Sequence, residues 1–175
     1  MIFGNYAQIR KYDVANGFGI RVTIFCTGCT HKCPGCFNEL YQDPNYGEQW
    51  TEEQTDLVIE YMKDPAVKGL TLLGGEPFQN TWLIDVIRRV KEETGKEIWA
   101  YSGYIYEKLI EDRDRLEMLK ECDILIDGPF KQDLLDLRLK FRGSSNQRVI
   151  DVKKTLETGE VVELPIDDPD YVHIN

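Results

Sequence analysis

Four cysteines crowd into one short segment of the chain and constrain what it can fold into more than any other feature. Cys26, Cys29, Cys33 and Cys36 lie within eleven residues, while a fifth, Cys122, stands alone. Disulfides that stabilise small secreted domains usually join distant segments, and a reducing cytosol would not keep them oxidised. The segment therefore indicates a metal or iron–sulfur site on a short loop.

The number of ligands decides which chemistry such a loop supports. The spacing Cys29-x3-Cys33-x2-Cys36 offers three thiolates, and three ligands on a cubane of four irons leave one iron open to a substrate. With Cys26 included, the same loop would equally close a tetrahedral zinc site or saturate a cluster. Because Cys26 ends a β-rich run, we expect its side chain to enter the core. We expect His31, inside the loop, to be exposed.

Short apolar runs alternate with amphipathic segments along the rest of the chain. Thr51 and Gln54 form a capping-box pattern before one helix, and Gly95 ends the next. Strands are predicted at residues 20–25, 70–73, 98–101 and 124–126, and helices at about 52–63, 81–94 and 105–120. This alternation implies a parallel sheet with right-handed crossovers and a site in the loops at the carboxyl ends of the strands.

The length of the chain limits how far such a sheet can close. A complete eight-stranded α/β barrel usually needs about 250 residues, and this chain has 175. We therefore expect an α/β fold in one domain, residues 1–175, built as an incomplete, open parallel β/α barrel of about five or six strands.

The composition indicates a globular protein with an excess of acidic groups. Hydrophobic residues make up 42% of the chain, and 21 Lys and Arg stand against 31 Asp and Glu, a formal net charge of −10. That field repels phosphate backbones, so we expect no nucleic-acid partner. No apolar run approaches the roughly 20 residues that span a bilayer, and no secretory signal is evident, so we expect a cytoplasmic protein without a membrane partner.

Positive charge is concentrated in one segment, residues 131–148. Its basic residues are Lys131, Arg138, Lys140, Arg142 and Arg148. Such a segment is either a solvated face or a surface that docks a protein partner.

Two motifs together resemble a known superfamily. Cys29-Thr-His-Lys-Cys33-Pro-Gly-Cys36 is followed, after the next predicted strand, by Gly74-Gly75-Glu76-Pro77. This pair resembles the radical S-adenosylmethionine superfamily. The resemblance implies a [4Fe–4S] cluster held by the three cysteines, with one open iron that receives S-adenosylmethionine.

Further segments narrow the resemblance. Residues 16–21, Asn-Gly-Phe-Gly-Ile-Arg, resemble a segment of glycyl-radical-enzyme activases in which Phe18 is usually Pro. Residues 99–104, 127–130 and 142–150 resemble the activating proteins of anaerobic (class III) ribonucleoside-triphosphate reductases. The resemblance covers about residues 1–155, and the order of the tail, residues 156–175, is left open.

The resemblance also implies residue roles. Without Cβ atoms, Gly74 and Gly75 would let the backbone approach the methionyl end of S-adenosylmethionine, while Glu76 would pair with its ammonium or hold the loop. The other residues expected to bind this cofactor are Pro77 in the same turn, Phe37 over the adenine, and Ser102 with Gly103 at the next strand end.

The activity implied by the resemblance is that of a glycyl-radical-enzyme activase. One-electron cleavage of S-adenosylmethionine would give a 5′-deoxyadenosyl radical that abstracts hydrogen from a glycine of the large anaerobic reductase subunit. The electron would come from a low-potential donor such as flavodoxin or ferredoxin. Two alternatives are a small-molecule radical synthase of the deazaguanine type, which residues 142–150 argue against, and a non-catalytic zinc or iron–sulfur module using all four clustered cysteines.

Overall fold

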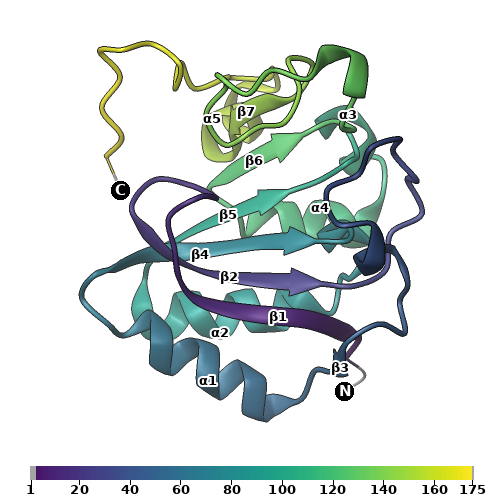
Figure 1. Ribbon diagram of the computed structural model, residues 1–175. Helices are drawn as coiled ribbons and strands as arrows, with labels where there is room; N and C mark the ends of the chain where they lie inside the picture. Colours follow the sequence, from purple (N-terminus) through teal and green to yellow (C-terminus); the bar gives the residue numbers. More distant parts are fainter. Residues whose placement is uncertain (1–2, 175) are drawn as a thin grey trace.

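Seven strands form one open, mixed sheet in the computed structural model, which describes residues 3–174 (Figure 1). The order across the sheet is β3-β1-β2-β4-β5-β6-β7. The strands are β1 (Asn5–Asp13), β2 (Ile20–Cys26), β3 (Glu48–Gln49), β4 (Val67–Gly74), β5 (Glu97–Tyr101), β6 (Ile124–Asp127) and β7 (Arg148–Asp151). The α/β class and the open sheet that the sequence predicts are confirmed.

The strand directions differ from the parallel barrel that the sequence predicts, and that barrel is not confirmed. β2, β4, β5 and β6 run parallel, whereas β1, β3 and β7 pair antiparallel at the two sides of the sheet. The reason is the length and nature of the connections. Residues 14–19 between β1 and β2 are too few for the crossover that a parallel pair requires. The chain between β6 and β7 returns as a loop with only a short 3₁₀ turn (Gln132–Leu134).

The predicted helices form with small changes of boundary. α1 (Glu52–Met62) begins after Thr51, whose N–H donates to the Gln54 side chain at 2.7 Å. The predicted helix at 105–120 is interrupted, because Asp112 caps a second helix by accepting from a backbone N–H of its first turn. The remaining helices are α2 (Leu83–Thr94), α3 (Tyr106–Leu109), α4 (Arg113–Lys120) and α5 (Val152–Thr158). None of the helices within residues 3–174 is long and apolar enough to cross a membrane.

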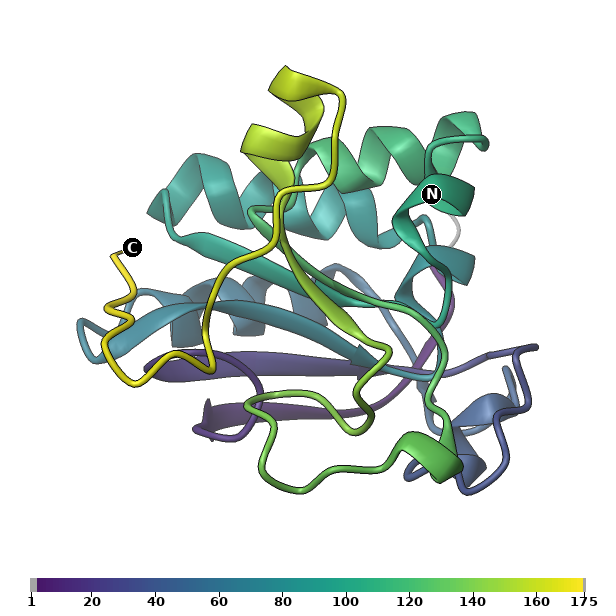
Figure 2. The same cartoon turned by 90° about the horizontal axis from the view of Figure 1, so that it is seen from above.

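The two faces of the sheet are covered differently. Helices α1, α2, α4 and α5 bury the outer face in the larger core cluster. The inner face carries a smaller cluster of Trp99, Ile124, Ile126, Val149 and Ile166, and loops cover it instead of helices. Figure 2 shows α2 and α4 on one side of the sheet and the loop that follows β6 on the other. Between these loops and the inner face lies a cavity lined by Phe25, Leu73 and Tyr101 of the sheet.

A buried arginine fastens the turn before β2 to this inner face. Arg21 is fully buried, and its guanidinium donates to Thr71 Oγ1 at 2.8 Å and to the carbonyls of Phe18 and Leu70 at 3.1 and 3.2 Å. The guanidinium also lies 5.1 Å from the Trp99 ring centroid. Burial lowers the pKa of Arg21 to about 10, so it stays charged at neutral pH. Its contacts are those of a structural residue.

Candidate functional site

The candidate site lies where the four parallel strands end. The loops that follow β2, β4, β5 and β6 meet at this edge and line a cavity of about 140 Å³. Eight of the residues predicted for the site line it: Cys29, Cys33, Cys36, Phe37, Gly74, Gly75, Ser102 and Gly103. The topology thus gathers segments that are far apart in the sequence.

The cysteines divide into three and one, as the sequence predicts. Cys29, Cys33 and Cys36 are partly exposed and line the cavity, whereas Cys26 is buried in the outer core beside Asn80, whose Nδ2 lies 3.7 Å from its Sγ. Burial raises the pKa of Cys29 to about 11. Thiols must lose their protons to bind metal, so loading this loop is coupled to proton release.

One buried carboxylate ties three loops of the site together. The Glu76 carboxylate accepts hydrogen bonds from the N–H groups of Phe78 at 2.9 Å and Gly103 at 2.7 Å, and from Ser102 Oγ at 3.0 Å. His31 Nε2, from the cysteine loop, lies 2.6 Å from the same carboxylate. A single side chain therefore fixes the turn after β4, the end of β5 and the cysteine loop relative to one another.

This network corrects one expectation and bears on another. His31 is not exposed: its side chain is only 17% accessible and lies edge-on to the Tyr104 ring at 4.5 Å. The hydroxyl of Ser102 and the N–H of Gly103 both donate to Glu76, although both residues line the cavity. Of the two roles considered for Glu76, its contacts are those of a residue that holds the loop.

The two glycines of the turn after β4 are required by the protein's own backbone. A Cβ on Gly74, which has φ +114°, would lie 2.2 Å from the Cys26 carbonyl oxygen, and one on Gly75 would lie 2.7 Å from that of Gly28. The N–H of Gly75 donates to the Cys26 carbonyl at 2.9 Å, and the next N–H donates to the Gly28 carbonyl at 2.9 Å. Close approach to a ligand is therefore not the main reason for glycine here. The N–H groups of Gly75 and Glu76 are therefore already engaged within the protein.

We expect Gly75→Val to disrupt more than cofactor binding. The added side chain would displace the cysteine loop, so the free energy of unfolding should fall by about 1–3 kcal/mol, typical of overpacking, and iron content should fall with it. Denaturant unfolding of the iron-free protein and iron analysis after reconstitution measure both. Gly159→Asn is the control, since nothing lies within 4 Å of a Cβ there. A Gly75→Val variant with parental stability and iron content would contradict the packing argument.

Two residues predicted for the site do not line the cavity, and one residue that lines it was not predicted. Glu76 and Pro77 do not line the cavity, since they form the buried turn behind it. Gln147 does line it, and its Nε2 donates to the Gly128 carbonyl at 3.1 Å. The signal for Gln147 was present in the sequence, because it belongs to the resembling segment 142–150.

An aromatic pair stands at the rim of the cavity. The Phe37 ring is 70% exposed, and its centroid lies 4.9 Å from that of Phe130. Both rings also line a second, larger cavity of about 530 Å³ on the inner face, which Tyr101 and Gln147 share with the candidate site. We call this second cavity the inner groove. The candidate site thus opens into a space that can hold part of a larger molecule.

Comparison with known proteins places the chain in a family. Residues 15–150 match a family model described as a 4Fe-4S single cluster domain. A relative from Escherichia coli K12 is 37% identical over 151 residues, covering 83% of this chain and 97% of the relative. Relatives from Vibrio cholerae and phage T4 are 39% and 38% identical over 149 residues, covering 82% and 83% of this chain and 95% and 92% of the relatives. All three are named anaerobic ribonucleoside-triphosphate reductase-activating protein.

This chain belongs to that family.

The donor set of this activating-protein chain fits the cluster that its family model describes. Cys29, Cys33 and Cys36 come from one loop and line one cavity, which is the arrangement that an inorganic core with several irons requires. Within residues 3–174, no three Cys, His, Asp or Glu side chains are gathered closely enough to hold a single metal ion.

The three arginines of the basic segment 131–148 form ion pairs with carboxylates of the same chain. Arg148 pairs with Asp127 at 2.5 Å and with Glu107 at 2.9 Å. Arg138 pairs with Asp136 at 3.0 Å, and Arg142 pairs with Asp167. Because these guanidinium groups pair with carboxylates of the same chain, residues 131–148 present less positive charge to another protein than the sequence indicates.

Proposed function

We propose that this chain is a radical S-adenosylmethionine enzyme that generates a glycyl radical in an anaerobic ribonucleoside-triphosphate reductase. Membership of the activating-protein family supports this. The single observation that carries it is the cavity at the carboxyl ends of the parallel strands, where three thiols face the turns after β4 and β5. When bound there, the cluster and S-adenosylmethionine supply a one-electron cleavage whose 5′-deoxyadenosyl radical takes hydrogen from a glycine.

The chain's own residues contribute position and exclusion of water. We assign Cys29, Cys33 and Cys36 as cluster ligands that leave one iron open. The carbonyl oxygens of Gly74 and Gly75 are suited to an ammonium group, because the adjoining N–H groups are already engaged. The role of this turn is thus to orient the cofactor. The reaction requires no acid–base pair from the protein.

The remaining assignments concern the adenine and the electron. We assign Phe37 to the adenine, because its exposed ring stands at the cavity rim beside Phe130. Pro77, Ser102 and Gly103 act indirectly, through the turn and the Glu76 network. The electron must come from a low-potential donor, for which we propose flavodoxin or ferredoxin.

The protein substrate has a place next to the site. The inner groove of about 530 Å³ continues from the candidate cavity along the inner face, and apolar side chains stand at its rim, including Leu137, which is 86% exposed. We propose that the glycine-bearing loop of the reductase enters this groove, which would bring its glycine beside the cofactor.

Electron paramagnetic resonance tests the proposal. The reconstituted protein is incubated without oxygen with S-adenosylmethionine, dithionite and the candidate reductase, and we expect a glycyl doublet that requires all components. Release of 5′-deoxyadenosine without a glycyl signal would indicate a small-molecule synthase. Iron binding without any cleavage of S-adenosylmethionine would indicate a binding module.

A further inference from the structure

The segment after α5 runs back and ends near the amino ends of the parallel strands (Figure 1), and it contacts the core cluster of the inner face. We call residues 163–174 the C-terminal strap. The strap begins with an antiparallel bridge between Ile150 and Glu163, and the Leu164 N–H donates to the Val149 carbonyl at 2.8 Å. Ile166 is only 1% exposed and packs in the inner core cluster with Trp99. Of the tail after residue 155, the strap contacts both β7 and the inner core cluster.

The strap lies outside the residues that the family model matches. The family model ends at residue 150, and the E. coli relative is matched over 97% of its length by 83% of this chain. The features below belong to this chain, and family membership does not account for them.

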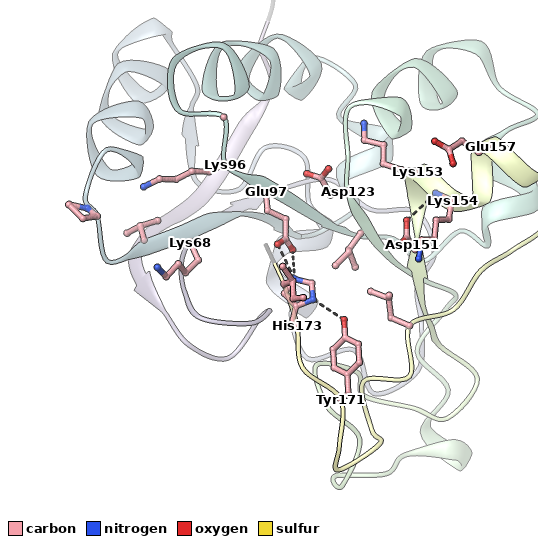
Figure 3. Close-up of a pocket in the computed structure, with 16 residues that line it drawn as sticks. Lys68, Lys96, Glu97, Asp123, Asp151, Lys153, Lys154, Glu157, Tyr171 and His173 are labelled. Atoms are coloured by element: carbon pink, nitrogen blue, oxygen red, sulfur yellow. Dashed lines mark hydrogen bonds and ion pairs between the residues drawn. The ribbon is translucent and has the colours of Figure 1, made fainter.

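The far end of the strap is anchored by His173. Its Nε2 lies 3.0 and 3.1 Å from the two Glu97 carboxylate oxygens, and its Nδ1 lies 2.8 Å from the Tyr171 hydroxyl (Figure 3). The imidazole also stacks on Phe18, with centroids 4.8 Å apart and planes at 17°. Phe18 stands where the activase pattern usually has Pro. Its aromatic ring is the one on which His173 of the strap stacks.

The middle of the strap is anchored to the loop 136–143. Asp167 accepts from the Lys140 N–H at 3.1 Å and pairs with the Arg142 guanidinium. The Arg142 side chain is only 10% exposed, and its Nε is buried without a hydrogen-bond partner in the described part of the chain. Because a buried guanidinium is costly without its counter-charge, Asp167 is the contact on which the placement of Arg142 depends.

The loop that the strap holds is a wall of the inner groove. Leu137, Phe141, Arg142 and Gly143 all line that groove. Phe141 is fixed from the other side, because its ring packs edge-on to Phe18 at 4.9 Å and its carbonyl accepts from the Tyr101 hydroxyl at 2.8 Å. The strap and the sheet thus clamp the groove wall between them.

A large cavity of about 740 Å³ lies at the opposite edge of the sheet, bounded by Leu164, Tyr171 and His173 of the strap (Figure 3). Its charged lining is balanced, with four lysines and four carboxylates: Lys68, Lys96, Lys153, Lys154, Glu97, Asp123, Asp151 and Glu157. These eight side chains carry no net charge, so the lining as a whole favours neither an anion nor a cation. The strap's consequence for function therefore lies on the groove side.

We propose that the C-terminal strap is a positioning element for the protein substrate, with Asp167 as the positioning residue that sets the groove wall through Arg142. The part of this inference that concerns the reductase rests on the proposed function. The strap does not reach the cysteine cavity, so loosening it should weaken productive docking of the reductase and leave cofactor cleavage intact.

Asp167→Asn tests the inference, with Asp170→Asn as the matched control. Both remove one carboxylate from the strap, but within residues 3–174 the exposed Asp170 side chain makes no hydrogen bond or ion pair with the loop 136–143. The first readout is hydrogen–deuterium exchange of the iron-free protein. We expect faster exchange across residues 136–143 in Asp167→Asn and parental exchange in Asp170→Asn.

The second readout uses the loaded enzyme. In Asp167→Asn, the KM for the reductase should rise about five- to tenfold, the scale of one lost charged contact, while release of 5′-deoxyadenosine without reductase stays parental. His173→Ala, which releases the other anchor, should shift both readouts in the same direction.

Three outcomes would overturn the inference: parental exchange of the loop in both Asp167→Asn and His173→Ala, an equal response of the Asp170→Asn control, or an equal fall of 5′-deoxyadenosine release with and without reductase. A parent protein that forms no glycyl radical would instead contradict the proposed function, while the exchange readout would still test the strap.

Discussion

Replacing Cys33 by Ala should abolish iron loading and every activity that depends on it, whereas Cys122→Ala should retain both. Cys33 lines the cavity with Cys29 and Cys36, while Cys122 is buried in the outer core. Loss of one of three thiolates leaves two irons of a cubane without protein ligands, so we expect loss of the cluster absorbance and at least a hundredfold loss of glycyl radical yield, the larger end of ligand-shell effects. Iron analysis and absorption spectra after anaerobic reconstitution measure the first effect.

Cys26→Ala separates the three-ligand site from a four-ligand site. Cys26 is buried away from the cavity, so this variant should lose about 1–2 kcal/mol of stability, as for a small core deletion, and keep its iron. If Cys26→Ala loses iron as completely as Cys33→Ala, the division of the cysteines into three ligands and one core residue is wrong.

The second large effect is expected from Glu76→Ala. Its carboxylate accepts from Phe78, Ser102 and Gly103 and contacts His31, so its removal leaves buried donors without an acceptor. Breaking a buried charged network by removing one partner costs about 3–5 kcal/mol. Denaturant unfolding of the iron-free protein should show that loss, and reconstitution should load little iron, because the cysteine loop is released.

Two comparisons give this result its meaning. Glu60→Ala removes an exposed carboxylate of α1 and should change stability by less than about 0.5 kcal/mol. His31→Ala cuts only the link to the cysteine loop, so it should lower iron retention more than it lowers stability. Parental unfolding and iron content in Glu76→Ala would show that this carboxylate does not hold the loops.

The parts of the fold that were predictable from sequence are those coded by local patterns. The parallel strands and α1 and α2 follow from apolar periodicity, caps and glycines. β1 escaped prediction because all of its residues before Asp13 are exposed or only partly buried, which leaves no clear alternation to read. β7 overlaps residues 142–150, which were interpreted through their resemblance to the activating proteins and not as a strand. Nothing in that segment specifies whether the strand pairs parallel or antiparallel.

In the site, too, features within one short segment could be predicted, whereas contacts between distant segments could not. The three thiols share one short loop, so their spacing alone indicated a common site. The Glu76 network joins residues that are 45 and 26 positions apart, and only the sheet topology brings them together. His31 was therefore expected in solvent, and the glycines were explained by a ligand when neighbouring backbone requires them.

The position of the strap in the chain has a consequence during synthesis. Residues 163–174 leave the ribosome after every residue they cover, so Trp99 and Val149 lack Ile166 as a neighbour until translation has passed the strap. The nascent protein therefore carries an uncovered apolar strip after its helical side has all the residues it needs. Exposed surface of this kind promotes aggregation of incomplete chains. Translation that stalls or terminates before residue 163 should yield products that depend on chaperones, even though the cysteine loop and the Glu76 side chain that holds it are already present.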